Sequence, residues 1–447
     1  MAQIDLLSLL IPYGQRQLKV KAKATGYTDS DMSNAVTYYS RPHVHRKDGT
    51  TLQITNCRAA ATNYEIYLDG AKVGDATYSG EDGGTLDVDV TNLGFTQNAI
   101  NKVYVKGTGT SVESNQSETF GFWYGENVIL GVSGLYQSEP ALTRTDDAVG
   151  LSWTMSNNVI SSDFDDKFPF NQMQRETIDG DVFVYVPAMY WRIGYDSNHY
   201  ITDIAVAPAA MAVGENQILA HSDAFYYGAY GARIVDGQMR SVGNGSRSGN
   251  YTRAQFREYA KARGAKYRQL DLYHMRVLDF LWLIEFATKN SDAVMQGLTS
   301  YGGTCGSTDS LTVPSGQLSS GGRMRWRYIE DFIGNGLEFF DGLTGYKATD
   351  IESNYTDDAT TGELTFSSCS GYFKSLKIDP SKPFIAVPQQ SGGSSSTYYC
   401  DYAYFGGYAV YCRGRVSAGS DCGLFYIINS SASSYYSSIG SRLLLTL

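Results

Sequence analysis

Alternating apolar and polar residues dominate the first 125 positions of the chain. Residues 18–39 (LKVKAKATGYTDSDMSNAVTYY) and 101–122 (NKVYVKGTGTSVESNQSETFGF) share one pattern: an alternating strand, a Gly/Ser turn and a polar strand that ends in aromatic residues. Between them, NYEIYLDGAKVG carries Asp69-Gly70, a pair that adopts positive φ at low cost and therefore predicts a tight hairpin turn. We expect a small β-sandwich over residues 46–124.

The main helical periodicity of the chain lies beyond residue 250. Thr252 and Gln255 form a capping box at the start of TRAQFREYAKARG, and Gly264 stands where that helix should end. The following segment, LDLYHMRVLDFLWLIEFATKNS, is apolar on nearly every face, which predicts a helix buried against a sheet. It contains Asp279 and Glu285, for which we expect polar partners inside the fold in preference to a catalytic role.

Strand patterns lie on both sides of this helical region. GDVFVYVPAMYWRIGY (180–195) is a β run in which Pro187 indicates an edge or a bulge, and RWRYIEDFIGNGLEFFDGL (325–343) combines aromatic strands with turns. Leu443-Leu444-Leu445 has the character of a buried final strand. These patterns predict an α+β fold. The predicted domains are an N-terminal attachment segment or partial β module (1–45), the β-sandwich (46–124) and a C-terminal domain (125–447).

Net charge and hydrophobicity argue against a nucleic-acid-binding protein and against a membrane protein. The chain of 447 residues has a formal net charge of −10, and phosphate binding needs clustered Lys and Arg, so we expect no nucleic-acid partner. No apolar run reaches membrane-spanning length, and MAQIDLLSLLIPYGQ lacks the basic region and the cleavage site of a secretory signal. We expect synthesis in the cytoplasm without a signal peptide and no insertion into a membrane.

Three short motifs each admit two interpretations. HVH (His43 to His45) could bind a metal ion, but no third ligand is evident, so two exposed histidines in a polar linker are the preferred interpretation. The acidic DFDD (163–166) could bind calcium, but it lacks EF-hand spacing, so a solvated turn is preferred. GNGSRSG (243–249) lacks the strand and helix that flank a phosphate-binding loop and predicts a turn. We expect no cofactor and no metal ion.

The six cysteines show neither a C-x-x-C pair nor histidine partners at zinc spacing. Scattered reduced thiols are the preferred interpretation. A bridge within the trio Cys400, Cys412 and Cys422 stays open, because spacing alone does not decide it.

The C-terminal segment lacks part of the amino-acid alphabet. Residues 391–447 contain no Lys, Glu, Gln, Met or Trp, whereas residues 1–390 contain 61 residues of these five types. In proportion, about nine would be expected in the segment. Low-complexity bias does not explain their absence, because Gly/Ser linkers lack the nine tyrosines and the aliphatic strands found in this segment.

The genetic code gives a sharper explanation. Replacing the adenines of AAC or AAT codons at random produces Asn, Tyr, Ser, Asp, Cys, Gly, Arg and other residues, but never the five missing types. Several residues in the segment have the character of fixed framework: Gly414, Gly419, Gly423-Leu424-Phe425, Ile439-Gly440 and Arg442-Leu443. The candidate variable positions between them are Tyr404, Phe405, Tyr408, Tyr411, Cys412, Arg413, Arg415, Val416, Ser420, Asp421, Cys422, Tyr426, Ile428, Ser430, Tyr435 and Tyr436.

Five stretches, in this order, resemble the variable proteins of diversity-generating retroelements. They are VFVYVPAMYWRI, TRAQFREYAKARGAKYRQLDLYHMRVLDFLWLIEFATKNS, WRYIEDFIGNGLEFFDG, GGSSSTYYCDY and GLFYIINSSASSYYSSIGSRL. The resemblance covers roughly residues 128–447, and such stretches recur in tail proteins of phages and prophages of gut bacteria. It implies a C-type-lectin-like domain of the formylglycine-generating-enzyme type. More loosely, the N-terminal part resembles the immunoglobulin-like modules of such tail proteins.

The resemblance also implies a function. The chain would be a receptor-binding or adhesion protein of the virion, at the tip of a phage tail fibre, with ligand-facing residues rewritten by adenine-specific mutagenic reverse transcription. Its partners would be a host cell-surface protein or glycan and other virion tail proteins, and a homotrimer is compatible with a fibre tip. Rigid amphipathic tyrosines and adaptable Ser, Gly and Asn are also typical of antibody paratopes. The expected anchors are Tyr404, Tyr408, Tyr411, Tyr426, Tyr435 and Tyr436, with Arg413 and Arg415 as polar or cation–π contacts.

Two other classes of protein stay open. The same fold type hosts a formylglycine-generating oxidase with a reactive cysteine pair, and Cys412 and Cys422 lie in the corresponding part of the chain. Both occupy candidate variable positions, and no His, Lys or helix N-terminus lies nearby in the sequence to activate a thiol. A purely structural virion protein would need no ligand surface. We expect a binding protein and not an enzyme.

Overall fold

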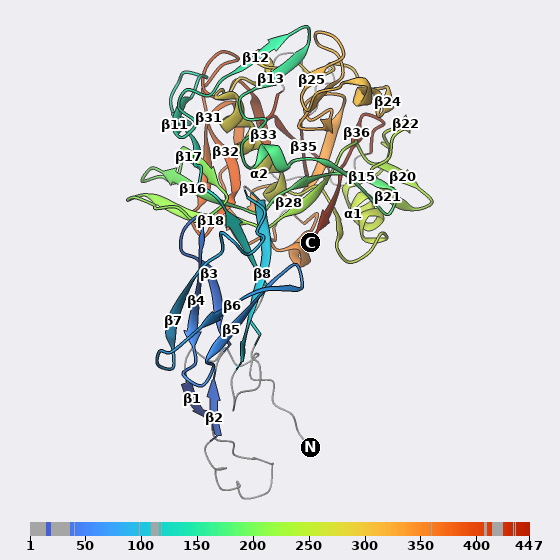
Figure 1. Ribbon diagram of the computed structural model, residues 1–447. Coiled ribbons are helices and arrows are strands. Elements are labelled where there is room, and N and C mark those ends of the chain that lie inside the picture. The colour runs from blue at the N-terminus through green and yellow to red at the C-terminus, as the bar shows by residue number, and fades with distance from the viewer. Residues whose placement is uncertain are drawn as a thin grey trace, which may run out of the picture. The chain divides into compact units, whose positions relative to one another are not determined.

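The chain forms two compact units, Met1–Asn127 and Val128–Leu447, each with its own hydrophobic core. Strands dominate both units, and helices α1 and α2 belong to the second (Figure 1). The computed structural model describes residues 15–18, 36–39, 41–97, 99–108, 116–117, 119–358, 360–405, 409–413, 423–431, 433 and 435–447. It gives the backbone alone at 15–18, 36–39, 405, 409–412 and 429–430.

The first unit consists mainly of two sheets that share one core. Its strands are β1 (Gln15–Leu18), β2 (Val36–Tyr39), β3 (His43–Arg46), β4 (Thr51–Cys57), β5 (Asn63–Leu68), β6 (Ala71–Thr77), β7 (Gly84–Asp89), β8 (Ala99–Thr108) and β9 (Phe120–Tyr124). The sheets have the orders β3–β4–β7 and β6–β5–β8–β9, and Leu52, Ile66 and Val103 lie in the core between them. The predicted hairpin is confirmed, because Asp69 and Gly70 join β5 to β6 with positive φ at both residues.

The sandwich begins earlier than the sequence predicted. His43 and His45 lie in β3, which pairs with β4, so the HVH motif is part of a strand and not of a linker. His45 Nε2 lies 3.2 Å from Thr55 Oγ1 on the neighbouring strand. The alternation of Val44 into the core and His45 toward solvent is what a strand at the surface of a sandwich requires.

The second unit contains several sheets around a central helix (Figure 1). One sheet pairs β11 (Thr143–Asp146), β10 (Leu130–Ser133), β17 (Ile201–Ala207), β16 (Met189–Tyr195) and β18 (Gln217–Ser222). A second pairs β12 (Trp153–Ser156), β13 (Val159–Ser162), β25 (Gly316–Gln317), β26 (Met324–Trp326) and β27 (Ile329–Glu330). A third pairs β14 (Arg175–Ile178), β15 (Asp181–Val186), β19 (Phe225–Gly228), β37 (Leu443–Thr446) and β23 (Tyr267–Gln269).

The fourth and largest sheet contains the C-terminal segment. Its order is β30 (Leu364–Thr365), β29 (Lys347–Ala348), β28 (Leu337–Thr344), β34 (Ala409–Cys412), β35 (Ile427–Ser430), β33 (Tyr402–Phe405), β31 (Cys369–Asp379) and β32 (Lys382–Ser391), with β36 (Ile439–Gly440) parallel to β28. Smaller pairs are β20 (Arg233–Val235) with β21 (Gln238–Arg240), and β22 (Gly245–Ser246) with β24 (Thr304–Cys305). The 3-10 helices are η2 (Phe170–Gln172), η3 (Ser291–Ala293), η4 (Ser307–Ser310) and η5 (Glu352–Asn354).

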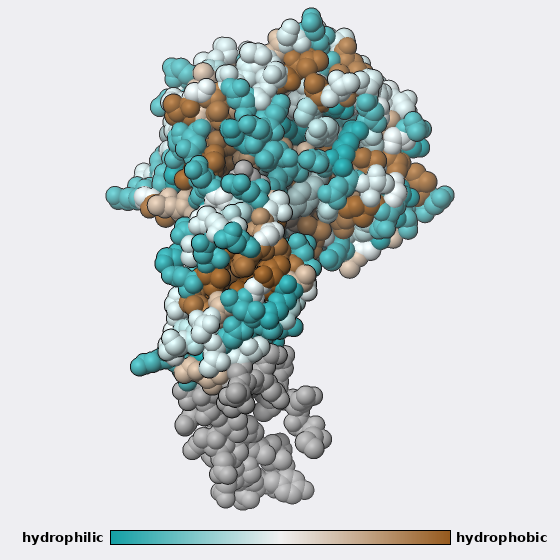
Figure 2. All heavy atoms as spheres, viewed as in Figure 1, coloured by the Kyte–Doolittle hydropathy of each residue, from teal (hydrophilic) through white to brown (hydrophobic). Residues whose placement is uncertain are grey.

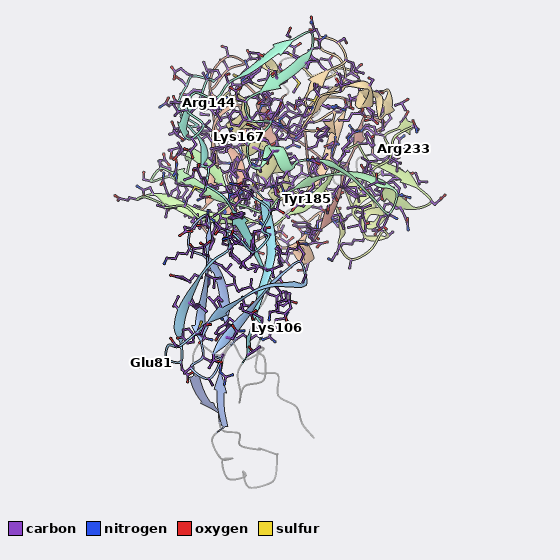
Figure 3. All side chains as sticks on the ribbon, viewed as in Figure 1. Glu81, Lys106, Arg144, Lys167, Tyr185 and Arg233 are labelled. Carbon is purple, nitrogen blue, oxygen red and sulfur yellow. The ribbon has the colours of Figure 1, made fainter. Side chains whose placement is uncertain are left out.

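Helix α2 (Leu272–Phe286) is enclosed by strands, as its apolar sequence predicted. It contacts β10 and β17 of one sheet and β28 and β32 of another. Asp271 caps its N-terminus by accepting a hydrogen bond from His274 N at 2.9 Å. At the other end, Arg144 (Figure 3) donates to the carbonyl oxygens of Ile284 and Glu285, both at 2.7 Å. Both ends of a buried helix therefore have hydrogen-bond partners.

The acidic residues of α2 have partners inside the fold, as predicted. Glu285 pairs with Arg327 (Nη2–Oε1 2.5 Å) and accepts a hydrogen bond from Trp326 Nε1 at 2.8 Å. Asp279 pairs with Arg276, one turn earlier on the same helix (Nη1–Oδ2 2.5 Å). Paired, hydrogen-bonded carboxylates are the form in which acidic residues are tolerated in a core.

Helix α1 (Arg253–Lys261) begins at the predicted capping box. Thr252 Oγ1 accepts a hydrogen bond from Gln255 N at 3.2 Å, and Gln255 Oε1 accepts one from Thr252 N at 2.9 Å. The helix ends at Lys261, and Gly264 follows with φ +140°. A side chain is strained at that φ, so glycine suits this exit from the helix.

Two strand predictions have different outcomes. Leu443, Leu444 and Leu445 lie in β37, which pairs with β19 on one side and with β23 on the other. The last strand is therefore an interior strand of its sheet, and the predicted burial of these residues is confirmed. Pro187 lies between β15 and β16, which belong to different sheets. It therefore ends one strand where the chain passes to another sheet, and the predicted edge or bulge is wrong.

Hydrophilic side chains alternate with small apolar patches over the visible face of the molecule (Figure 2). Within the described residues, the helices are too short or too polar to cross a bilayer.

Candidate functional site

Three strands of the C-terminal segment lie side by side in the largest sheet. β33 pairs with β35 in parallel, and β34 pairs with β35 antiparallel. Tyr404 lies opposite Ile428, and Ile428 lies opposite Tyr411. Three candidate variable positions thus occupy one row across adjacent strands. At its Tyr411 end the row lies opposite the fully buried Phe339 of β28, and Ile428 packs against the core cluster that contains Phe339. We call Tyr404, Ile428 and Tyr411 the display row.

Burial alternates along these strands. Ala403 and Ile427 are fully buried, whereas Tyr404 is 46% exposed and Ile428 is half-buried. Successive side chains of a strand point to opposite faces, so Ala403 and Ile427 face the core and Tyr404 faces solvent. Tyr404 is accessible to a ligand; its role in binding stays a prediction.

The display row continues onto a strand that the sequence reasoning did not include. Ser370 of β31 lies opposite Tyr404, and Tyr372 lies opposite Tyr402, with the two rings 5.9 Å apart and nearly perpendicular. Both β31 residues precede the segment with the restricted alphabet. Nothing in their own sequence marks them, because only strand pairing brings them beside Tyr404.

A second exposed group lies in the connection between β35 and β36. Tyr435 and Tyr436 are 64% and 57% exposed. The backbone beneath them is held in place, because the Tyr436 carbonyl oxygen accepts hydrogen bonds from Asn250 N at 3.0 Å and Ile439 N at 3.1 Å. Large aromatic side chains on a fixed backbone are suited to contacting a partner.

Arg413, predicted to contact a ligand, is instead buried. It is 2% exposed, and its guanidinium pairs with Asp279 of α2. It also donates to Tyr227 Oη at 3.1 Å and to the Met275 carbonyl oxygen at 3.2 Å, and lies over the Phe332 ring at 4.2 Å. The cation–π contact exists, but it is internal. The prediction for Arg413 is therefore wrong: an arginine with a buried carboxylate partner is a fixed part of the fold.

Tyr426, predicted to be a ligand anchor, is also part of the interior at 7% exposure. Arg413 N donates to the Tyr426 carbonyl oxygen at 3.3 Å, and Gly334 N donates to the Arg413 carbonyl oxygen at 2.8 Å. The two buried residues thus bring together both ends of the connection between β34 and β35. We call Arg413, Tyr426 and Asp279 the loop base.

The framework residues predicted from the sequence are buried wherever they are described, and their invariance stays a prediction. Gly423, Leu424 and Phe425 are buried, as are Ile439, Gly440, Arg442 and Leu443. Two side chains from other segments accept hydrogen bonds from the backbone of residues 423–425. Leu424 N donates to Ser291 Oγ at 3.0 Å, and Phe425 N donates to Asp401 Oδ2 at 2.8 Å. Gly414 and Gly419 lie outside the described residues.

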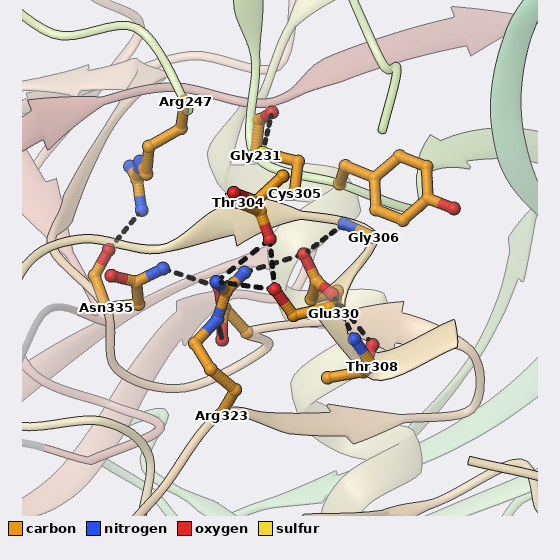
Figure 4. A network of polar contacts seen from close by, with 12 residues as sticks. Gly231, Arg247, Thr304, Cys305, Gly306, Thr308, Arg323, Glu330 and Asn335 are labelled. Atoms are coloured by element: carbon orange, nitrogen blue, oxygen red, sulfur yellow. Dashed lines mark hydrogen bonds and ion pairs between the residues drawn. The ribbon is translucent and has the colours of Figure 1, made fainter. Parts of the chain in front are cut away.

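A second buried arginine, Arg442, follows β36. It pairs with Glu338 of β28 (Nη2–Oε1 3.0 Å) and donates to the Gly228 carbonyl oxygen at 3.1 Å. Arg247, within the Gly/Ser stretch predicted to be a plain turn, is buried and donates to the Asn335 carbonyl oxygen at 2.6 Å (Figure 4). The exposed residues that precede β36 are therefore followed by buried residues that ion pairs and hydrogen bonds hold in place.

The remaining predicted site residues fall in two groups. The backbones of Phe405, Tyr411, Cys412 and Ser430 lie in β33, β34 and β35, and Cys412 is in register with the buried Ile427 and Glu338. The positions outside the described residues are Tyr408, Arg415, Val416, Ser420, Asp421 and Cys422.

The side chains of four cysteines are described, and all four are buried and free: Cys57, Cys305, Cys369 and Cys400. Burial raises the pKa of the first three to about 11 and that of Cys400 to about 12. Thiols with such pKa values carry almost no thiolate at neutral pH and are poor nucleophiles.

The part of the chain that the structure describes contains no group of three or more His, Cys, Asp or Glu side chains arranged to hold a metal ion. In the acidic DFDD stretch, Asp163 accepts a hydrogen bond from Ser152 N at 2.8 Å, and Asp165 pairs with Arg327 at 2.7 Å. Residues 163–166 form a turn in which Asp163, Asp165 and Asp166 are exposed, so the predicted solvated turn is confirmed. Two of its carboxylates also bind neighbouring segments of the fold.

Comparisons with known proteins give a weak structural likeness. No protein-family model matches the chain, and no curated protein matches it. Among solved structures, the chain is similar to PvdO from Pseudomonas aeruginosa, with 12% sequence identity over 62% of this chain and 99% of that chain, and a TM-score of 0.28. A TM-score this low does not establish a shared fold.

Proposed function

We propose that the chain is a ligand-binding protein that displays a diversified surface on a C-type-lectin-like domain of the formylglycine-generating-enzyme type, preceded by an immunoglobulin-like sandwich. The observation that carries the proposal is the composition of residues 391–447, which lack the five amino-acid types that adenine replacement in AAC and AAT codons cannot produce. The exposure of Tyr404, Tyr435 and Tyr436 supports it, because these candidate variable positions stand on the surface.

The physical chemistry of the surface and its support fits this function. Tyrosine offers large contact area at low entropic cost, and the surrounding serines and glycines adapt their hydrogen bonds to different partners. A surface that varies needs a support that does not change with it. The buried α2, the loop base and the Arg442–Glu338 pair supply such a support, since their contacts are independent of the exposed side chains.

In this proposal the ligand is a host cell-surface protein or glycan, and the chain belongs to a phage tail together with other virion proteins. Weak single contacts suffice at a fibre tip, because several copies engaged at once raise the effective concentration of each binding site. A homotrimer would provide such multiplicity.

Sequencing the gene and its surroundings tests the proposal. We expect a near-copy of the segment that encodes residues 391–447 beside a reverse-transcriptase gene, with mismatches confined to adenines of the copy. In that copy the codons for positions 404, 435 and 436 should contain adenines, whereas the Arg413 codon should contain none, because Arg413 is buried. Absence of any such copy, or mismatches spread over all four bases, would refute the proposal.

A further inference from the structure

A pocket of about 530 Å³ lies in the second unit, and no candidate variable residue lines it. Leu219 and His221 of β18 form one wall, Lys382 and Phe384 of β32 form another, and Tyr273 of α2 also lines it. Asp350, which follows β29, is the acidic residue of the lining, and Gln217 and Ser381 add uncharged polar groups. The volume is within the range of small-molecule sites, roughly 300–1,000 Å³.

The lining contains one acidic residue, Asp350, and one basic residue, Lys382, and two further carboxylates, Glu363 and the exposed Asp223, lie next to lining residues. Lys382 Nζ pairs with both Asp350 and Glu363, the latter at 2.8 Å, so one positive charge faces two negative ones. Asp223 Oδ1 lies 3.5 Å from His221 Nδ1 and adds a third carboxylate. Burial lowers the pKa of His221 against the opposing effect of Asp223, so the imidazole is largely neutral at pH 7.

Aromatic and aliphatic surface accompanies this negative charge. Tyr273 packs against Phe384 with the rings 4.9 Å apart, and Leu219 is 43% exposed at the pocket wall. Burial raises the pKa of Tyr273, and the charges of Asp223, Asp271 and Asp350 raise it further, which indicates a negative potential at this phenol. The hydroxyl therefore stays protonated and available as a donor, and no described residue hydrogen-bonds to it.

We propose that this pocket binds a small organic ammonium ion. Excess carboxylate charge attracts a cation and repels anions. A bare metal ion would need several converging oxygen ligands, whereas this pocket also presents apolar and aromatic wall. An alkylammonium group matches both features, because its charge meets the carboxylates while its carbon atoms contact Leu219, Tyr273 and Phe384. The proposal concerns a different surface from the display row and does not depend on the proposed function.

Calorimetric titration of the full chain with choline at pH 7.5 tests the inference. The matched control is 3,3-dimethylbutan-1-ol, which has nearly the shape of choline but no charge. We expect choline to bind at least about tenfold more tightly than the alcohol, a difference of about 1.4 kcal/mol. Equal binding of the two, or no detectable binding of choline, would overturn the proposal.

Two substitutions should change the affinity for choline in opposite directions, and a general loss of structure could not produce both results. Asp350→Asn removes one carboxylate and should weaken choline binding severalfold, whereas Lys382→Gln removes the competing cation and should strengthen it. Asp236→Asn, at an exposed turn that does not line the pocket, should leave the affinity unchanged. Melting curves identify variants that fail to fold. Weaker choline binding by a folded Lys382→Gln variant would contradict the inference.

Discussion

Arg413 and Asp279 form a buried ion pair between residues that lie 134 positions apart in the chain. The second oxygen of Asp279 accepts a hydrogen bond from Arg276 at 2.5 Å, so one carboxylate of α2 serves two guanidinium groups. Arg276 also donates to the Ala386 carbonyl oxygen of β32 at 2.7 Å. This arrangement fixes the end of β34 to the central helix.

Replacing Arg413 by alanine should lower the free energy of unfolding by about 3–5 kcal/mol, because the buried Asp279 loses one of its two cationic partners. Urea unfolding followed by far-UV circular dichroism measures the change. Tyr436→Ala is the control, since that exposed residue should change the stability by less than about 0.5 kcal/mol. If Arg413→Ala were as stable as this control, Arg413 would be a display residue after all.

Two tyrosines of the same segment should respond oppositely to truncation. Tyr426→Ala removes a buried ring and should cost roughly 3 kcal/mol or more, whereas Tyr435→Ala, 64% exposed before the change, should be nearly neutral. Thermal melts of the two variants in parallel distinguish them. Equal melting temperatures would mean that Tyr426 is not part of the core.

The pH dependence of stability should reveal the charge on Glu338. Burial raises the pKa of this carboxyl, but the charges of Arg442, Arg247 and Arg413 outweigh burial and hold the pKa below its ordinary value. A carboxyl whose pKa is lower in the folded chain stabilises the fold above its unfolded pKa, about 4.3, and loses that contribution as the pH falls toward the folded pKa.

We therefore expect Glu338→Gln to be markedly less stable than the wild type at pH 7, with a difference that narrows between about pH 4.5 and pH 3. Both proteins contain all the other titrating groups, so the difference between their free energies of unfolding at one pH reports on Glu338 alone. Urea unfolding at pH 7, 5, 4 and 3 gives the difference. A difference that stayed constant would show that Glu338 is uncharged in the native state.

Thiol labelling should show that the four buried cysteines are protected in the native protein. At pH 8, native protein should show no reaction of Cys57, Cys305, Cys369 or Cys400 with iodoacetamide, because burial blocks access and raises their pKa values. Labelling in 6 M urea reaches every reduced thiol and serves as the reference. Mass spectrometry of tryptic peptides reports each site, and rapid native labelling of Cys400 would contradict its burial.

Several local features followed from the sequence because neighbouring residues alone determine them. The Asp69-Gly70 turn and the Thr252–Gln255 capping box depend on backbone preferences and on contacts within four residues. The burial of α2 followed from its uniformly apolar faces, since the surrounding strands cover all of them. The framework residues of the C-terminal segment followed from their glycine and aliphatic character.

Tertiary structure alone decided which residues of the C-terminal segment face solvent. Arg413 and Tyr426 have the same side-chain chemistry as the candidate display residues, and only Asp279, brought close by the packing of α2 against the sheet, makes an arginine stable inside the fold. Strand pairing likewise placed Ser370 beside Tyr404. The sequence by itself determined the local elements and the restricted alphabet, whereas exposure and partners depend on contacts between distant segments, which local patterns do not encode.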